Sequence, residues 1–237
     1  MAIGALFGFQ GFLGWYMVSS GLVENPAVDH FRLTTHLLMA LFLLALTMWT
    51  ALRHVHGFPK VIKEGRGSLP YILSAVVLAV LVIQITYGGF VAGLKAGWIS
   101  NTFPLMGGRW IPNTLFAQFD TWWQNLISAP VGVHFVHRWF AFVVLGAAVW
   151  LYFITRRHTY STSVHKVVVY FLWLVAIQIT LGVTTIWFSV PIYLALTHQA
   201  VGLLLFVLAV YIRYEIVHTP LPEQIVERQT AVAQSGD

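Results

Sequence analysis

Six long apolar stretches alternate with shorter polar connections along the chain. They lie near residues 4–23, 32–52, 70–94, 132–155, 167–189 and 194–213. Crossing the hydrocarbon core of a bilayer takes about 20 helical residues, and each stretch approaches or exceeds that length. The pattern predicts an all-α, polytopic membrane helix bundle with six transmembrane helices.

Composition supports this class and excludes others. Hydrophobic residues make up 58% of the chain and charged residues only 9%, whereas soluble domains carry roughly a quarter charged residues. The absence of cysteine excludes disulfides, thiolate ligands and iron–sulfur clusters. The net charge of +5 comes from basic residues in short connections, so it indicates membrane orientation rather than nucleic-acid binding.

The basic residues predict that orientation. They gather in the second and fourth connections and at the start of the tail, at Arg53, Lys60, Lys63, Arg66, Arg156, Arg157, Lys166 and Arg213. The positive-inside rule then places these segments and both termini in the cytoplasm. The polar tail, residues 219–237, is predicted to be disordered.

The connection 95–131 is too long for a turn and too aromatic for a linker. Loops of this length are usually functional or disordered. Its prolines, paired glycines and tryptophans predict an ordered lid on the outer surface, above the histidines.

Three histidines lie near the outer ends of three apolar stretches that run in the same direction. His36, His137 and His198 each come about four or five residues into their stretch, so at 1.5 Å rise per residue they share one depth. An ionisable side chain at such a place indicates a functional site. We interpret His137 and His198 as the two axial ligands of one heme, an arrangement that suits electron transfer.

The neighbouring polar residues have more than one interpretation. His36 is expected to be a ligand too, with Arg32 one turn before it. Arg138 either pairs with a heme propionate or extends to the membrane interface. His134 is expected to be solvated or in contact with the lid. For the ligand histidines, the alternative role is a hydrogen bond to a backbone carbonyl or between helices.

A short motif repeats along the chain. Ile83-Gln-Ile-Thr-Tyr-Gly88 recurs as Ile177-Gln-Ile-Thr-Leu-Gly182, with a weaker copy at Phe9-Gln-Gly-Phe-Leu-Gly14. The repeat predicts one complete four-helix unit at 67–218 and half of a second at 1–66, whose other half would precede residue 1. Gln10, Gln84 and Gln178 stand at equivalent places, and we expect them to bridge helices rather than contact a porphyrin.

Longer motifs resemble the heme A synthase family, in its alphaproteobacterial and mitochondrial-like form. They cover nearly the whole chain: Leu13-Gly-Trp-Tyr-Met-Val-x-Ser-Gly-Leu22, Arg32-Leu-x-x-His36-Leu, Val91-Ala-Gly-Leu-x-Ala-Gly97, Asn101-Thr-Phe-Pro-Leu-Met106, Trp110-Ile-Pro112, Phe135-x-His137-Arg138 and Leu196-x-His198-Gln199.

The resemblance implies an eight-helix protein of two four-helix halves in the bacterial inner membrane, with the 95–131 loop in the periplasm. The C-terminal half would hold heme b through His137 and His198. The N-terminal half would bind the substrate heme O, with His36 as a catalytic ligand and Arg32 beside it. The reaction would oxidise a ring methyl of heme O to a formyl group, through two hydroxylations and loss of water, giving heme A for terminal oxidases.

The resemblance also implies binding partners, and the sequence departs from the family pattern at some positions. The partners would be membrane lipid, heme O synthase, oxidase assembly factors or a second copy of the chain. The family's first two helices and their Glu-x-x-His-Arg motif have no counterpart in the sequence, and Lys95 replaces an aspartate found in many relatives. Two other functions stay open: a non-catalytic membrane b-type cytochrome or heme-handling subunit, and a transporter or assembly partner without heme.

Overall fold

The computed structural model describes residues 2–19, 28–58, 67–158 and 160–218. Within them the chain is helical apart from the outer loop and short connections. The elements are α1 (Ala2–Ser19), α2 (His30–Val55), α3 (Leu69–Gly93), the 3₁₀ helix η1 (Ala96–Trp98), α4 (Trp122–Ile127), α5 (Pro130–Arg157), α6 (Thr162–Trp187) and α7 (Ile192–His218). The expected tail, Met1 and the basic residues Lys60, Lys63 and Arg66 lie outside the described residues.

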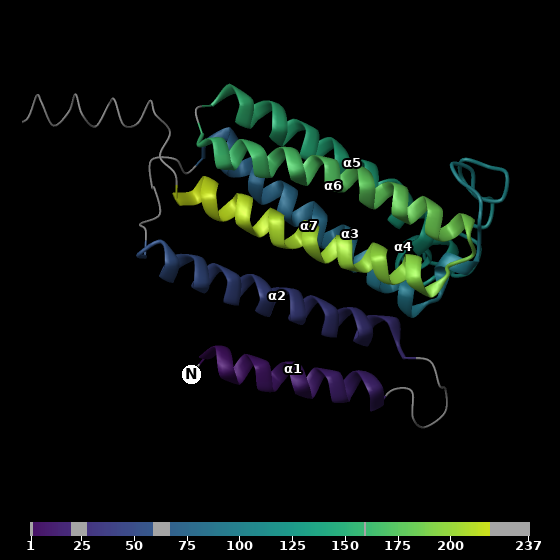
Figure 1. Ribbon diagram of the computed structural model, residues 1–237. Helices are drawn as coiled ribbons and strands as arrows, with labels where there is room; N and C mark the ends of the chain where they lie inside the picture. The colour runs from purple at the N-terminus through teal and green to yellow at the C-terminus, as the bar shows by residue number, and fades with distance from the viewer. Residues whose placement is uncertain (1, 20–27, 59–66, 159, 219–237) are drawn as a thin grey trace, which may run out of the picture.

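The long helices alternate in direction, so α2, α5 and α7 run one way and α1, α3 and α6 run the other (Figure 1). Most neighbouring long helices are therefore antiparallel, among them α1 with α2, α3 with α5, and α6 with α7. Helices α3, α5, α6 and α7 pack around a shared core of mostly aliphatic side chains that includes Phe171 and Phe206, and α2 contributes Leu41 to it. Helix α1 touches this bundle through α2 and lies at its edge (Figure 1).

Five helices in the described part of the chain, α2, α3, α5, α6 and α7, are long and apolar enough to cross a membrane. The chain is therefore an all-α, multi-pass membrane protein. The sixth predicted span, 4–23, corresponds to α1, whose 18 residues end at Ser19. The outer loop, predicted at 95–131, ends at Ala129, because Pro130 is the first residue of α5. Proline suits this position, since the first N–H groups of a helix have no hydrogen-bond acceptor within the helix.

Helix α2 is packed closely against α3 at two glycines four residues apart. A Cβ on Gly89 would lie 2.6 Å from Thr34 Oγ1, and a Cβ on Gly93 would lie 2.6 Å from the Cα of His30. Small residues at this spacing let membrane helices approach closely. The α2–α3 contact therefore depends on the missing side chains at these two positions.

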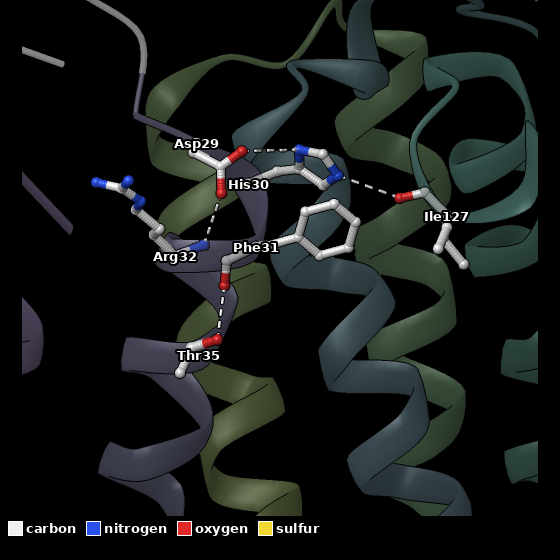
Figure 2. A network of polar contacts seen from close by, with 6 residues as sticks. All are labelled: Asp29, His30, Phe31, Arg32, Thr35 and Ile127. Carbon is white, nitrogen blue, oxygen red and sulfur yellow. Dashed lines mark hydrogen bonds and ion pairs between the residues drawn. The ribbon is translucent and has the colours of Figure 1, made fainter. Parts of the chain in front are cut away.

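A small polar network fixes the N-terminal end of α2 (Figure 2). The Asp29 carboxylate accepts a hydrogen bond of 3.0 Å from the Arg32 backbone N–H, which caps the helix. The Nε2 atom of His30 lies 3.2 Å from the carbonyl oxygen of Ile127. Because Ile127 is the last residue of α4, this contact connects α2 to the outer loop, in addition to the packing of α2 on α3.

The α2–α3 contact gives a test of the packing. Gly93→Ala should lower thermal stability by about 1–3 kcal/mol, because the new methyl meets backbone atoms that cannot move alone. Thermal denaturation of the detergent-solubilised protein, followed by tryptophan fluorescence, measures the loss. Gly146→Ala is the matched control, since a Cβ at Gly146 meets nothing within 4 Å. Equal melting temperatures for the two variants would contradict the packing described.

Candidate heme-binding site

In three helix pairs, α1 with α2, α3 with α5 and α6 with α7, a glutamine on one helix is hydrogen-bonded to a histidine on the other. The Nε2 atoms of Gln10, Gln84 and Gln178 donate to the backbone carbonyls of His36, His137 and His198, at 3.1, 3.0 and 2.9 Å. The same nitrogens lie 3.3 Å from a ring nitrogen of the same histidines. The prediction that the glutamines bridge helices is confirmed.

A glycine one turn after each glutamine makes room for the histidine ring. A Cβ added at Gly14 would lie 3.1 Å from the Cε1 atom of His36. The corresponding distances are 3.3 Å from Gly88 to His137 and 3.1 Å from Gly182 to His198. Any side chain there would press on the imidazole. The repeated motif therefore forms three equivalent histidine-binding units, here called Gln–Gly cradles, each made of a glutamine, a glycine and the histidine packed on them.

Two of the three cradles face each other. The ring centres of His137 and His198 are 6.4 Å apart, and their planes meet at 76°. His137 lies seven residues after the start of α5 and His198 six after the start of α7, so the predicted equal depth is confirmed. The Nδ1 atom of His198 is buried without a hydrogen-bond partner.

That ring spacing matches what a shared metal requires. Imidazole nitrogen binds a transition metal at about 2.0–2.1 Å, and its ring centre lies about 1.15 Å behind that nitrogen, so two rings on opposite sides of one metal have centres about 6.4 Å apart. The rings can rotate about the metal–nitrogen bonds, so the angle of 76° is compatible with such a site. The two residues fit bis-histidine ligation of a heme iron, a role that remains a prediction.

His36 lies in the third cradle, between α1 and α2. Its ring contacts Gln10 and Gly14, and no ring contact with another histidine is found in the described part of the chain. Arg32, one turn before it, contacts α1 instead: its Nη1 donates to the Tyr16 carbonyl at 3.3 Å, and its guanidinium covers the Tyr16 ring at 4.1 Å.

Arg138, the residue after His137 on α5, contacts the outer loop. Its Nη2 donates to the carbonyls of Thr102, Pro104 and Leu105, at 2.5, 3.5 and 3.3 Å, and its guanidinium lies over the Phe103 ring. The side chain is buried, and its Nη1 has no hydrogen-bond partner. A buried guanidinium with free donors is suited to an anion.

The loop that Arg138 contacts is ordered, as the sequence predicted. Asn125 is fully buried, accepts hydrogen bonds from the backbone N–H groups of Gln118 and Phe119, and donates to the carbonyls of Phe119 and Thr121. Sequence reasoning missed Asn125, because an asparagine in a loop resembles an ordinary turn residue.

His134 lies beneath this loop. The solvated alternative for His134 is wrong, since its side chain is 2% exposed and lies against the backbone of Ala96 in η1. The lid-contacting alternative is confirmed. The reason is that η1 folds back over the first turn of α5 and covers this side chain.

Comparison with known proteins places these features in a family. Residues 1–210 match the family model COX15-CtaA, described as cytochrome oxidase assembly protein. The chain is 41% identical to heme A synthase from Flavobacterium psychrophilum over 205 residues, 86% of this chain and 59% of the relative. It is 43% identical to heme A synthase from Flavobacterium johnsoniae, over 86% of this chain and 59% of the relative. It is 41% identical to heme A synthase from Agrobacterium fabrum, over 85% of this chain and 54% of the relative.

The chain thus spans less than two thirds of the length of these relatives. No solved structure gives a significant match.

The contacts of Arg138 give a test of how the loop is held. Arg138→Gln should raise the rate of chymotrypsin cleavage in the loop about ten-fold or more, because charge-assisted hydrogen bonds contribute roughly 1.5–3 kcal/mol each. Arg109→Gln is the control, since Arg109 lies in the same loop with an exposed side chain. An unchanged cleavage pattern in Arg138→Gln would show that the loop is held by other contacts.

Proposed function

Because the chain belongs to the COX15-CtaA family of cytochrome oxidase assembly proteins, we propose that it carries out heme A synthesis, with heme b held between His137 and His198. The substrate is heme O, one of whose ring methyls becomes a formyl group. The observation that supports this most is the 6.4 Å spacing of the two rings at the outer end of parallel helices α5 and α7. A second support is the identity of about 40% with several heme A synthases.

The residues divide into two groups by their place in the bundle. His137 and His198 would hold the iron of heme b, which would supply electrons when bound. The unpartnered Nη1 of Arg138 would bind a propionate, while Nη2 holds the outer loop through its carbonyls. Excluding water there strengthens the electrostatic contacts of bound groups.

The α1–α2 pair forms the substrate side of the proposal. His36, fixed by Gln10 and Gly14, is a ligand of heme O, and Arg32 lies one turn closer to the outer end. In this proposal α1 is the sixth membrane-spanning helix. Its exposed aromatic side chains, among them Phe9, Phe12 and Trp15, then face lipid.

The proposed orientation follows from the charges at the two ends of the helices. Arg53 is in the last turn of α2, and Arg156 and Arg157 are in the last turn of α5, so they share the end opposite the histidines. By the positive-inside rule this end is cytoplasmic, and the outer loop lies on the periplasmic side of a bacterial inner membrane. Terminal oxidase assembly factors and heme O synthase are the expected partners.

One observation favours a second function. His36 faces no other histidine in the described part of the chain, whereas His137 and His198 face each other. A chain that binds heme b alone would act as a non-catalytic b-type cytochrome or heme-handling subunit.

The ligand assignment can be tested by spectroscopy. In His137→Ala the reduced-minus-oxidised b-type spectrum of the purified protein should disappear, since one imidazole cannot give bis-histidine ligation. His54→Ala is the control, because His54 is exposed at the opposite end of the bundle and bonds only to its own helix, at the Thr50 carbonyl. A normal b-type spectrum in His137→Ala would refute the assignment.

Supplying heme O distinguishes heme A synthesis from heme binding without catalysis. Incubation of the reconstituted protein with heme O, oxygen and a reductant should yield heme A, measured by extraction and chromatography. His36→Ala should reduce the yield at least ten-fold while the heme b spectrum is retained. A protein that keeps its heme b spectrum and forms no heme A would be the binding subunit of the second proposal.

A further inference from the structure

Five consecutive residues of the outer loop, 107–111, are exposed and are here called the loop tip. They stand between two buried residues, Met106 and Pro112, which fix the tip on the rest of the loop. Trp110 is 61% exposed and Ile111 is 63% exposed. Two large apolar side chains side by side in the sequence, at the exposed part of an otherwise anchored loop, indicate a contact with something outside the chain.

The main chain of the loop tip finds part of its hydrogen bonds within the turn. Met106 and Arg109 exchange two backbone hydrogen bonds, of 2.8 and 3.3 Å. Gly107 and Gly108 between them have φ angles of +61° and +79°, in the left-handed region that glycine adopts without strain. Backbone groups that are paired within the chain do not depend on water, so such a turn can lie at the edge of a bilayer.

The position of Trp110 along the bundle follows from its contact with α5. Its ring centre lies 5.8 Å from that of Trp139, which also contacts Phe135 and Phe142 on the same helix. Trp139 comes about 17 residues before Arg156, in the last turn of α5, which corresponds to about 25 Å of helix. A hydrocarbon core about 30 Å thick that begins near Arg156 therefore ends close to Trp139 and Trp110.

The exposed tryptophans of the described residues mark the same boundary. Only two of them, Trp150 and Trp173, lie well inside long helices. The others lie in the outer loop or at the helix ends next to it, at Trp15, Trp98, Trp110, Trp122, Trp123 and Trp187. Tryptophan is enriched where the acyl chains of a bilayer meet the headgroups. The loop tip thus belongs to a belt of aromatic side chains at this level.

We propose that the loop tip is inserted into the lipid leaflet at this end of the bundle, beside α5. Trp110 and Ile111 lie among the ends of the acyl chains nearest the headgroups, and the exposed Arg109 guanidinium lies at the lipid phosphates. The charge of the loop supports lipid as the partner, because no acidic residue lies between Lys95 and Asp120. A cation next to large apolar side chains matches a phosphate above acyl chains.

Insertion gives the outer loop two separate attachments. Within the protein, the carbonyls of Thr102, Pro104 and Leu105 accept hydrogen bonds from Arg138. Outside the protein, lipid holds the tip a few residues further along the chain. This inference depends on the loop and its depth in the membrane, and it does not depend on heme binding.

The absence of cysteine makes the depth of the tip measurable, because one introduced cysteine is then the only labelling site. Ile111→Cys is labelled with a nitroxide and reconstituted into vesicles of phosphatidylcholine and phosphatidylglycerol. Power-saturation electron paramagnetic resonance gives the accessibility of the label to oxygen, which concentrates in the acyl chains, and to a nickel chelate, which stays in water. Gln118→Cys, exposed in the same loop, is the aqueous control, and Val143→Cys, exposed on α5, is the lipid control.

Insertion predicts a ratio of oxygen to nickel accessibility about ten-fold higher at position 111 than at position 118, since a polar chelate is largely excluded from acyl chains. The ratio should approach that at position 143. A ratio equal to that at position 118 would place the tip in water and overturn the proposal. Low accessibility to both reagents would also overturn it, because the tip would then be covered by protein, such as a second copy of the chain.

Discussion

The structure depends on how a histidine is accommodated inside a membrane-spanning helix. An imidazole there must find partners within the protein, since lipid offers none. The chain meets this requirement the same way three times, with a glutamine amide bonded to the histidine backbone and ring, and a glycine that leaves space for the ring. Each arrangement needs two antiparallel helices, so the pairing of α1 with α2, α3 with α5 and α6 with α7 is inseparable from the placement of the histidines.

The repeat provides the units, and packing decides how they are combined. Helices α3, α5, α6 and α7 share one core and bring two cradles together, so that His137 and His198 face each other. The third unit, α1 with α2, joins this bundle through the glycines of α3 and the polar network around Asp29 and His30 (Figure 2). The same local motif therefore yields one site with two histidines and one site with a single histidine in the described residues.

Hydrophobic periodicity and the positions of the histidines predicted most of the fold. Of the six apolar stretches predicted to be spans, five are long and apolar enough to cross a membrane, and the equal depth of His137 and His198 followed from helix direction and rise alone. What the sequence left open were the details that depend on side-chain contacts between distant segments. His134 is buried because η1 covers it, and Arg138 bonds to backbone carbonyls of the loop. Neither contact can be predicted from the residue types alone. The glutamines were noticed because they repeat, but their bond to the histidine could not be deduced, since the pairing of helices was not known.

Two consecutive residues of α5, His137 and Arg138, contact different parts of the protein. Successive side chains on an α-helix point about 100° apart, so His137 can face α7 while Arg138 faces the loop. A guanidinium remains charged when buried and therefore requires partners. Three loop carbonyls supply some of them at Nη2, and the free Nη1 leaves one side open to an anion. The contact of α5 with His198 on α7 and its contact with the outer loop are thus made by two consecutive residues of one helix.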